Sequence, residues 1–181
     1  SITGWMNNPD ILFNEKILEK GANIVKEVNR EVAQIIGINA AARTTCVKPS
    51  GNASVLLQTA SGIHAEHSNM YIRNVQMNKE SEITQAIMKT NPYMVEESVW
   101  SSTGTDVVVS FPILPKKGSM YKDDLLGIKH LELVKKAQKH WVETGTNEDL
   151  CADKGIRHNV SNTIIVDDWD NVEKYVYENR D

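Results

Sequence analysis

The spacing of apolar residues along the chain predicts helices that alternate with extended segments. Apolar side chains recur at three- and four-residue intervals, typical of helices, in residues 10–37, 52–59, 80–90, 123–144 and 169–179. The longest of these repeats follows Pro9 and ends at Gly37, which suit the start and the end of a helix. Gly145 follows the 123–144 repeat and is expected to cap that helix.

Alternation of apolar and polar residues predicts strands between these helices. The segments are residues 43–47, 70–77 and 157–166, with two further β-rich runs at 93–100 and 105–111. Because Ser101 to Gly104 separates the last two runs, we expect them to form a β-hairpin. Strands alternating with helices indicate an α/β protein with a largely parallel sheet or barrel. The length of 181 residues predicts a single domain, 1–181.

Composition narrows the classes of function. With 24 acidic and 20 basic residues, the net charge of −4 gives no electrostatic basis for binding nucleic acid or a membrane. The sequence contains neither an apolar run of membrane-spanning length nor a signal peptide, so a cytoplasmic location is expected. Cys46 and Cys151 form no C-x-x-C pair and are expected to be buried packing residues. His130 and His140, on a charged helix, are expected to be solvated.

The segment from Lys48 to Ser54 has the residues of an anion-binding loop. A strand, a Pro-Ser-Gly turn and a helix follow one another there, and the first amides of a helix have no partner within it. Gly51 would let a phosphate approach the backbone, while Ser50, Asn52 and Ser54 add donors. The alternative is a helix capped by Ser50 with no ligand. Neither a Walker sequence nor G-x-G-x-x-G occurs.

The wider sequence around this loop resembles one enzyme family. Residues 43–57 read RTTCVKPSGNASVLL, residues 61–64 read SGIH, and residues 70–75 read MYIRNV. These strings are similar to the T-x-x-K-P-S-G-T-x-S, G-(I/V)-H and Y-I-R-R strings of the catalytic subunit of ribonucleotide reductases. The resemblance is strongest to the monomeric, adenosylcobalamin-dependent class II triphosphate reductases. Residues 1–4 and 157–163 extend it weakly toward both ends of the chain.

The resemblance implies a fold, a cofactor and a binding site. The expected fold is a partial segment of the family's ten-stranded α/β barrel with a β-hairpin insertion, and the implied cofactor is adenosylcobalamin. The residues expected to hold the substrate phosphates are Pro49, Ser50, Gly51, Asn52, Ala53 and Ser54. Lys48 and His64 are candidates for lining the pocket. Asn52 stands where the family often has threonine, and it can still donate a hydrogen bond.

Several parts of the family's chemistry do not occur in this sequence. The N-x-C-x-E loop that carries the radical cysteine and the C-terminal thiol pair are both missing. We therefore expect the C-terminal part of the catalytic barrel, without catalytic residues of its own and inactive when isolated. Its expected partners are a ribonucleotide substrate and the remainder of the barrel.

Two other functions remain open: a class I large subunit without cobalamin, and a nucleotide-binding or assembly module without catalysis. A metal site is also conceivable, because histidine and glutamate side chains gather between His64 and Ser68. That spacing matches no zinc signature, so no metal is expected.

Overall fold

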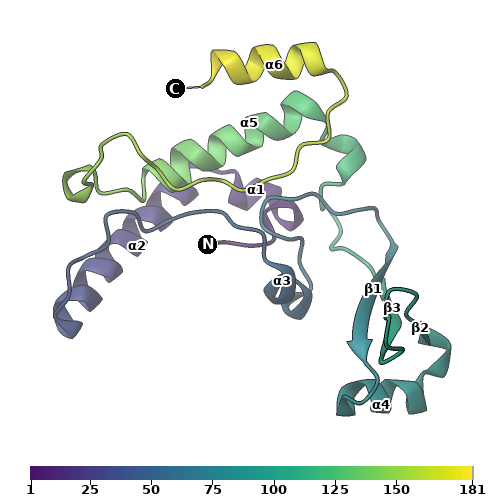
Figure 1. The fold of residues 1–181 in the computed structure, drawn as a ribbon. Coiled ribbons are helices and arrows are strands. Elements are labelled where there is room, and N and C mark those ends of the chain that lie inside the picture. The colour runs from purple at the N-terminus through teal and green to yellow at the C-terminus, as the bar shows by residue number, and fades with distance from the viewer. Residues whose placement is uncertain (181) are drawn as a thin grey trace. The chain divides into compact units, whose positions relative to one another are not determined.

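The computed structural model describes residues 1–180, which form two compact units (Figure 1). Unit 1 combines residues 1–67 with residues 115–180, and unit 2 is Ser68–Leu114. The candidate loop lies entirely within unit 1.

Unit 1 is built mainly from helices. They are α1 (Pro9–Leu12), α2 (Glu15–Ile36), α3 (Gly51–Leu57), α5 (Gly127–Ala137) and α6 (Trp169–Glu178), with 3-10 turns at Trp5–Asn7, Lys122–Asp124 and Glu148–Leu150. The predicted 10–37 helix is interrupted at Asn14, whose side chain caps α2 by accepting from the Ile17 amide at 3.2 Å. Gly37 ends α2 in the left-handed conformation, as predicted.

The core of unit 1 forms where α2 packs against the end of the α5 helix. Beyond Ala137 this helix continues as a π-helical turn, Gln138–Glu143, which carries Trp141 and Val142 into the core beside Leu18 of α2. The remaining buried core residues are Trp5, Met6, Ala22, Val47, Ala60, Ile63, Leu125, Ala137 and Val160. In Figure 1, α6 lies along α5.

Gly145 has a different role from the cap that the sequence predicted. Its backbone is not in the left-handed region. A Cβ at this position would lie 2.6 Å from Thr45 Cγ2 and 2.7 Å from Thr45 Cβ. The glycine therefore allows residues 43–47 to approach the end of the helix closely.

The sequence predicted a largely parallel sheet, and this prediction is wrong for the described residues. Residues 43–47 and 157–166 are extended, but they meet through one isolated parallel bridge, Val47 with Val160. A second parallel bridge joins Leu126 to Ile165. A ladder does not develop, because the Thr44 amide donates to Gly145 O and the Thr45 carbonyl lies 3.0 Å from the ring Nδ1 of His158 rather than from a strand amide.

Unit 2 is a small antiparallel sheet with one helix. Strands β1 (Tyr71–Asn78), β2 (Val95–Glu97) and β3 (Asp106–Ile113) lie in the order β1-β3-β2, and α4 (Glu82–Thr90) and a 3-10 turn (Pro92–Met94) connect β1 to β2. The strand predicted at 70–77 is thus confirmed as β1. β2 and β3, which are consecutive in the chain, pair antiparallel, and β1 pairs with the other edge of β3, whose Val107 and Val109 side chains are buried.

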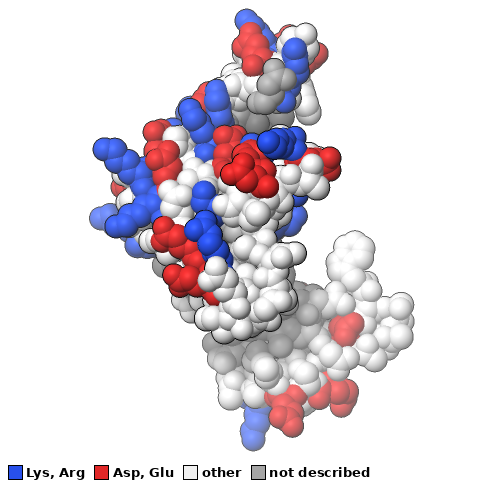
Figure 2. All heavy atoms as spheres, turned by 90° about the vertical axis from the view of Figure 1, so that its left-hand side faces the viewer, with Lys and Arg blue, Asp and Glu red and all other residues white. Residues whose placement is uncertain are grey.

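The charged side chains of the described residues are mixed in sign. In the upper part of Figure 2, acidic and basic side chains lie interspersed. Within residues 1–180, no helix combines the length and the apolar character needed to cross a bilayer.

Candidate phosphate-binding loop

Ser50 precedes α3 but does not cap it with its side chain. Its φ of −125° and ψ of 80° are those of a flanking, non-helical residue. The Ser50 hydroxyl is hydrogen-bonded to Thr3 Oγ1, and its amide donates to Ser61 Oγ at 2.9 Å. Ser50 is thus the N-cap residue of α3 by position, but its side chain makes no capping hydrogen bond.

Three consecutive amides at the start of α3 are unpaired. Those of Gly51, Asn52 and Ala53 have no hydrogen-bond partner within the described residues, and all three residues are exposed. The Ser54 amide is the first to be paired, with Ser50 O at 3.0 Å. The Ser54 side chain is buried and bonds back to the Ser50 and Gly51 carbonyls. The donors that remain are thus the backbone of Gly51 to Ala53 and the exposed side chain of Asn52.

A hydrogen-bond network centred on Thr3 holds the loop in place. Thr3 Oγ1 donates to Ala60 O at 2.9 Å and accepts from the Gly62 amide at 2.9 Å. Gly62 has a φ of +55°, and a Cβ there would lie 2.7 Å from Lys48 O. The network therefore holds residues 48–50 directly against residues 60–62, where only glycine fits.

The two candidate pocket residues bond to the 157–166 segment. The Lys48 ammonium group donates to Ser161 Oγ at 3.0 Å, not to a residue of 49–54. His64 Nδ1 lies 2.9 Å from Ser61 O, and its Nε2 lies 3.2 Å from Thr163 Oγ1. Because a carbonyl only accepts, Nδ1 donates in the hydrogen bond to Ser61 O. Both side chains connect the loop to this segment.

His130 is a structural residue of the site that the sequence did not predict. It is 3% exposed, and its Nε2 donates to the carbonyl of Ile63 at 2.9 Å. Burial lowers the pKa of His130, the hydrogen bond to Ile63 opposes this shift, and nearby His64 adds to it. The expected solvation of His130 is wrong. Its position four residues after Leu126, on the apolar face of the helix, was the available signal.

His140 also differs from the solvated residue expected. Its Nδ1 lies 2.7 Å from Glu19 Oε1, and its side chain is only 12% exposed. This pair links α2 to the π-helical turn and lies outside the loop. Of the two cysteines, Cys151 is buried, as expected. Cys46 is only half-buried.

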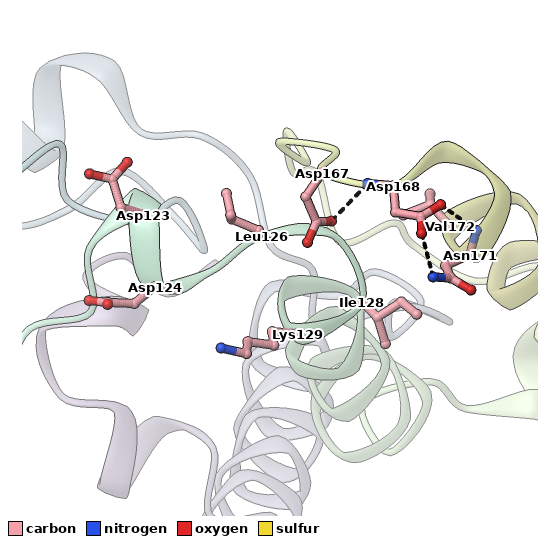
Figure 3. A pocket seen from close by; sticks show the side chains of 9 residues that line it. All are labelled: Asp123, Asp124, Leu126, Ile128, Lys129, Asp167, Asp168, Asn171 and Val172. Carbon is pink, nitrogen blue, oxygen red and sulfur yellow. Dashed lines mark hydrogen bonds between the residues drawn. The ribbon is translucent and has the colours of Figure 1, made fainter.

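Two cavities in unit 1 lie apart from the loop. The first, of about 190 Å³, is bordered by Asp123, Asp124, Asp167 and Asp168, and the last of these caps α6 (Figure 3). Its carboxylates would repel a phosphate. The second, of about 520 Å³, lies between α5 and α6. Neither is lined by residues 48–54. Among residues 1–180, no three histidine, cysteine or acidic side chains are placed to hold a metal ion.

Comparison with known proteins gives two relatives in sequence. The chain is 29% identical, over 123 residues, to a probable adenosylcobalamin-dependent ribonucleoside-triphosphate reductase of Dictyostelium discoideum. It is 24% identical, over 136 residues, to the adenosylcobalamin-dependent ribonucleoside-triphosphate reductase of Euglena gracilis. The resemblance to these reductases is confirmed. The matches cover 68% and 75% of this chain but only 16% and 18% of the relatives, so the chain spans less than a fifth of their length.

A solved structure shares the fold. The crystal structure of a B-12 dependent (class II) ribonucleotide reductase matches 83% of this chain and 19% of its own, with a TM-score of 0.63 and 18% identity. No family model matches the sequence. The mixture of helices with a small sheet agrees with the expected α/β class.

Proposed function

We propose that this chain is part of a ribonucleotide reductase that converts ribonucleotides to 2′-deoxyribonucleotides by thiyl-radical chemistry for DNA synthesis. The observation that carries the proposal is the sequence similarity to two reductases, which covers most of this chain. Both relatives are named as adenosylcobalamin-dependent, which favours class II over a class I large subunit. When these residues act alone, they would form a nucleotide-binding or assembly module that catalyses no reaction.

The chain would contribute one segment of the ten-stranded barrel, with the remainder of that barrel as its partner. The parallel bridges at Val47 with Val160 and at Leu126 with Ile165 support this arrangement, because each joins segments that run as neighbouring parallel strands would. Strands from the remainder of the barrel would extend these bridges into ladders.

Within that enzyme, the start of α3 would hold the substrate phosphates. The amides of Gly51, Asn52 and Ala53 are exposed and unpaired, and they lie at the positive end of the helix dipole. Asn52 adds a side-chain donor, whereas Ser50 and Ser54 are engaged within the protein and would act by shaping the loop. Pro49 precedes the turn and is exposed beside it. Lys48 and His64 would position the neighbouring 157–166 segment through Ser161 and Thr163.

The described residues do not fit a complete cobalamin site. Neither of the two cavities described above borders the loop, and Cys46 and Cys151 lie outside any N-x-C-x-E string. We therefore assign adenosylcobalamin to the longer enzyme and derive no step through it. The contribution of this chain is to bind and orient the nucleotide, and its own residues supply no radical chemistry.

Titration with a ribonucleoside triphosphate, followed by amide NMR, tests the loop. We expect the Gly51, Asn52 and Ala53 resonances to shift together and saturably, because charge-assisted hydrogen bonds would form at these amides. Gly51→Pro should weaken binding about tenfold or more, since it removes one donor and adds a ring to the loop. Proline is tolerated at this first helical position, so α3 should survive.

The matched control is Glu82→Pro, the same change at the first position of α4 in unit 2. It should leave nucleotide binding unchanged. Saturable binding that leaves the three amides unshifted, or that Gly51→Pro does not weaken, would contradict the loop assignment.

A further inference from the structure

The α-helices of this chain differ in how the side chain of the N-cap residue is used. α2, α4 and α6 follow Asn14, Ser81 and Asp168, and each of these side chains accepts a hydrogen bond from the amide three residues later. α1 and α3 follow Asn8 and Ser50, which are also residue types that cap well, yet neither side chain does so. α5 follows a leucine, which has no group that could cap.

The two polar side chains that do not cap are hydrogen-bonded elsewhere. Asn8 Oδ1 accepts from the ammonium group of Lys116, and the Ser50 hydroxyl is bonded to Thr3 Oγ1. Within residues 1–180, the three side chains that do cap make hydrogen bonds only to the first turn of their own helix. A polar N-cap residue of this chain therefore caps its helix unless another residue holds its side chain.

The other bonds of the Thr3 hydroxyl decide the direction of its contact with Ser50. Its one proton is donated to Ala60 O at 2.9 Å, because a carbonyl only accepts. Its oxygen also accepts from the Gly62 amide at 2.9 Å. Ser50 is therefore the donor to Thr3. Thr3 itself is held in place, because the amides of the next two residues donate to carbonyls of the 60–62 segment at 2.9 and 3.2 Å.

We propose that Thr3 is a positioning residue that keeps Ser50 from capping α3 and so leaves the amides at the start of this helix available to a phosphate. A serine at the N-cap ordinarily accepts from the amide of the second or third helical residue, and the third is Ala53 here. That amide is one of the three donors that the proposed function assigns to the substrate, and the inference rests on that assignment. The backbone agrees with it, since Ser50 has a ψ of 80° and the three capping residues have ψ between 108° and 138°.

A Ser50 cap and a phosphate would compete for the same donor. One N–H makes a well-aligned hydrogen bond to one acceptor, so a Ser50 hydroxyl turned toward Ala53 has to be displaced before a phosphate oxygen can bind there. The bond to Thr3 removes this step, because the hydroxyl already points away from α3. The loop is thereby pre-organised for an anion.

Amide hydrogen exchange, measured by NMR on the 181-residue chain without ligand, tests the role of Thr3 directly. Thr3→Val removes the hydroxyl and keeps the shape of the side chain, so Ser50 is released to cap. Exchange at Ala53 should then slow about fivefold, the effect of one serine cap. Thr3→Ser keeps a hydroxyl and should exchange at the unaltered rate. A purely structural role for Thr3 predicts the opposite change, because a loosened loop exchanges faster.

Three serine-to-alanine changes complete this experiment. Thr3→Val/Ser50→Ala has no capping oxygen, so exchange at Ala53 should return to the unaltered rate. Ser50→Ala alone removes a hydroxyl that does not cap and should leave that rate unchanged, whether or not Thr3→Val folds. Ser81→Ala is the matched positive control. The Thr84 amide donates to Ser81 Oγ at 3.2 Å, so exchange at Thr84 should become about fivefold faster.

Titration with inorganic triphosphate, followed by amide NMR, measures the consequence for binding. Thr3→Val should raise the dissociation constant about fivefold, because the new cap has to be broken first. Thr3→Val/Ser50→Ala should bind more tightly than Thr3→Val, since no side-chain oxygen competes for the Ala53 amide.

Three results would each overturn the proposal. The first is an exchange rate at Ala53 that Thr3→Val leaves unchanged or raises. The second is faster exchange at Ala53 in Ser50→Ala, which would mean that Ser50 already caps α3. The third is a double variant that binds triphosphate as weakly as Thr3→Val. If the unaltered chain binds no triphosphate, the phosphate assignment itself is wrong, and the exchange rates separately decide whether Thr3 restrains Ser50.

Discussion

A single buried histidine links α5 to the loop next to the candidate site. His130 donates to the carbonyl of Ile63, the residue between Gly62 and His64. Gly62 touches the backbone of Lys48 and is tied to Thr3, which also bonds to Ser50. The imidazole therefore anchors the segment on which residues 48–50 rest, and its charge state bears on the stability of the whole loop.

Because burial lowers the pKa of His130, we predict that the protein loses stability in mild acid. Below the unfolded pKa of about 6.5, the unfolded chain binds a proton that the folded chain resists, so the free energy of unfolding falls as the pH falls. One such proton gives a slope of at most about 1.4 kcal/mol per pH unit. Urea unfolding between pH 7.5 and 5 measures it.

His130→Gln supplies the comparison for this prediction. Glutamine keeps a donor for Ile63 O but does not titrate, so the slope between pH 6.5 and 5 should decrease by most of that amount. Equal slopes for His130→Gln and the unaltered protein would refute the assignment.

Gly145 lies so close to Thr45 that adding one methyl group would disrupt the contact. We predict that Gly145→Ala lowers the free energy of unfolding by about 1–3 kcal/mol, because the new methyl group would overlap Thr45 in a packed region. Thr45→Ala alone should cost about 1 kcal/mol, since it removes the hydrogen bond to Trp141 O. The double variant should be more stable than the sum of both losses implies, since Thr45→Ala removes Oγ1 and Cγ2, two of the three Thr45 atoms that the new methyl group would overlap. Strict additivity would contradict the contact.

Gly51→Ala is a matched control for the Gly145 experiment. A methyl group added at position 51 would have no other atom within 4 Å, and φ is ordinary there, so we expect a change of no more than about 0.5 kcal/mol. A loss similar to that of Gly145→Ala would mean that backbone flexibility, not the contact with Thr45, sets the cost.

At the scale of elements, the helices were predictable and most of unit 1's strands were not. The apolar repeats of α2 and α6 extend over several turns, and local residues such as Gly37 and Asp168 mark their ends. Residues 43–47 and 157–166 also have strand-like patterns, yet each pairs through single bridges. A ladder depends on a neighbour elsewhere in space, and alternation within one segment carries no information about that neighbour.

The candidate site, too, could be predicted only in part from the sequence. The prediction that residues 49–54 bind an anion follows from local sequence, because Pro-Ser-Gly before an apolar run predicts a helix start. Which donors remain free does not follow from it. Ser50 is engaged by Thr3 and Ser61, and those contacts join residues far apart in sequence. Only the three-dimensional arrangement separates the unpaired amides of Gly51 to Ala53 from the side chains that shape the loop.

At the scale of the whole molecule, unit 2 is inserted between two paired segments of unit 1. The Glu66 amide donates to Met120 O at 3.0 Å, and the Lys122 amide donates to Glu66 O at 2.9 Å. The Met120 amide in turn donates to Met6 O at 2.8 Å, within the core of unit 1. The points where the chain leaves and re-enters unit 1 are thus held together by unit 1 itself.

We therefore predict that replacing residues 68–114 with a short Gly-Ser linker leaves unit 1 folded. The core residues of unit 1 all lie outside the deletion, and the Glu66–Met120 pairing closes the gap. The shortened chain should unfold cooperatively in urea, followed by the fluorescence of the buried Trp5 and Trp141. Its m-value should be smaller than that of the full chain, because less surface becomes exposed.

A longer deletion, residues 68–121, tests whether the Glu66–Met120 pairing is what keeps unit 1 folded, or whether unit 1 tolerates any deletion at this point of the chain. It removes Met120 and Tyr121, and with them the hydrogen bond from the Glu66 amide to Met120 O and the one from the Met120 amide to Met6 O. Its free energy of unfolding should fall well below that of the 68–114 deletion, because buried backbone groups lose their partners. If the 68–114 deletion itself fails to fold, the two units depend on each other. The chain would then be the single cooperative domain, 1–181, that its length predicts.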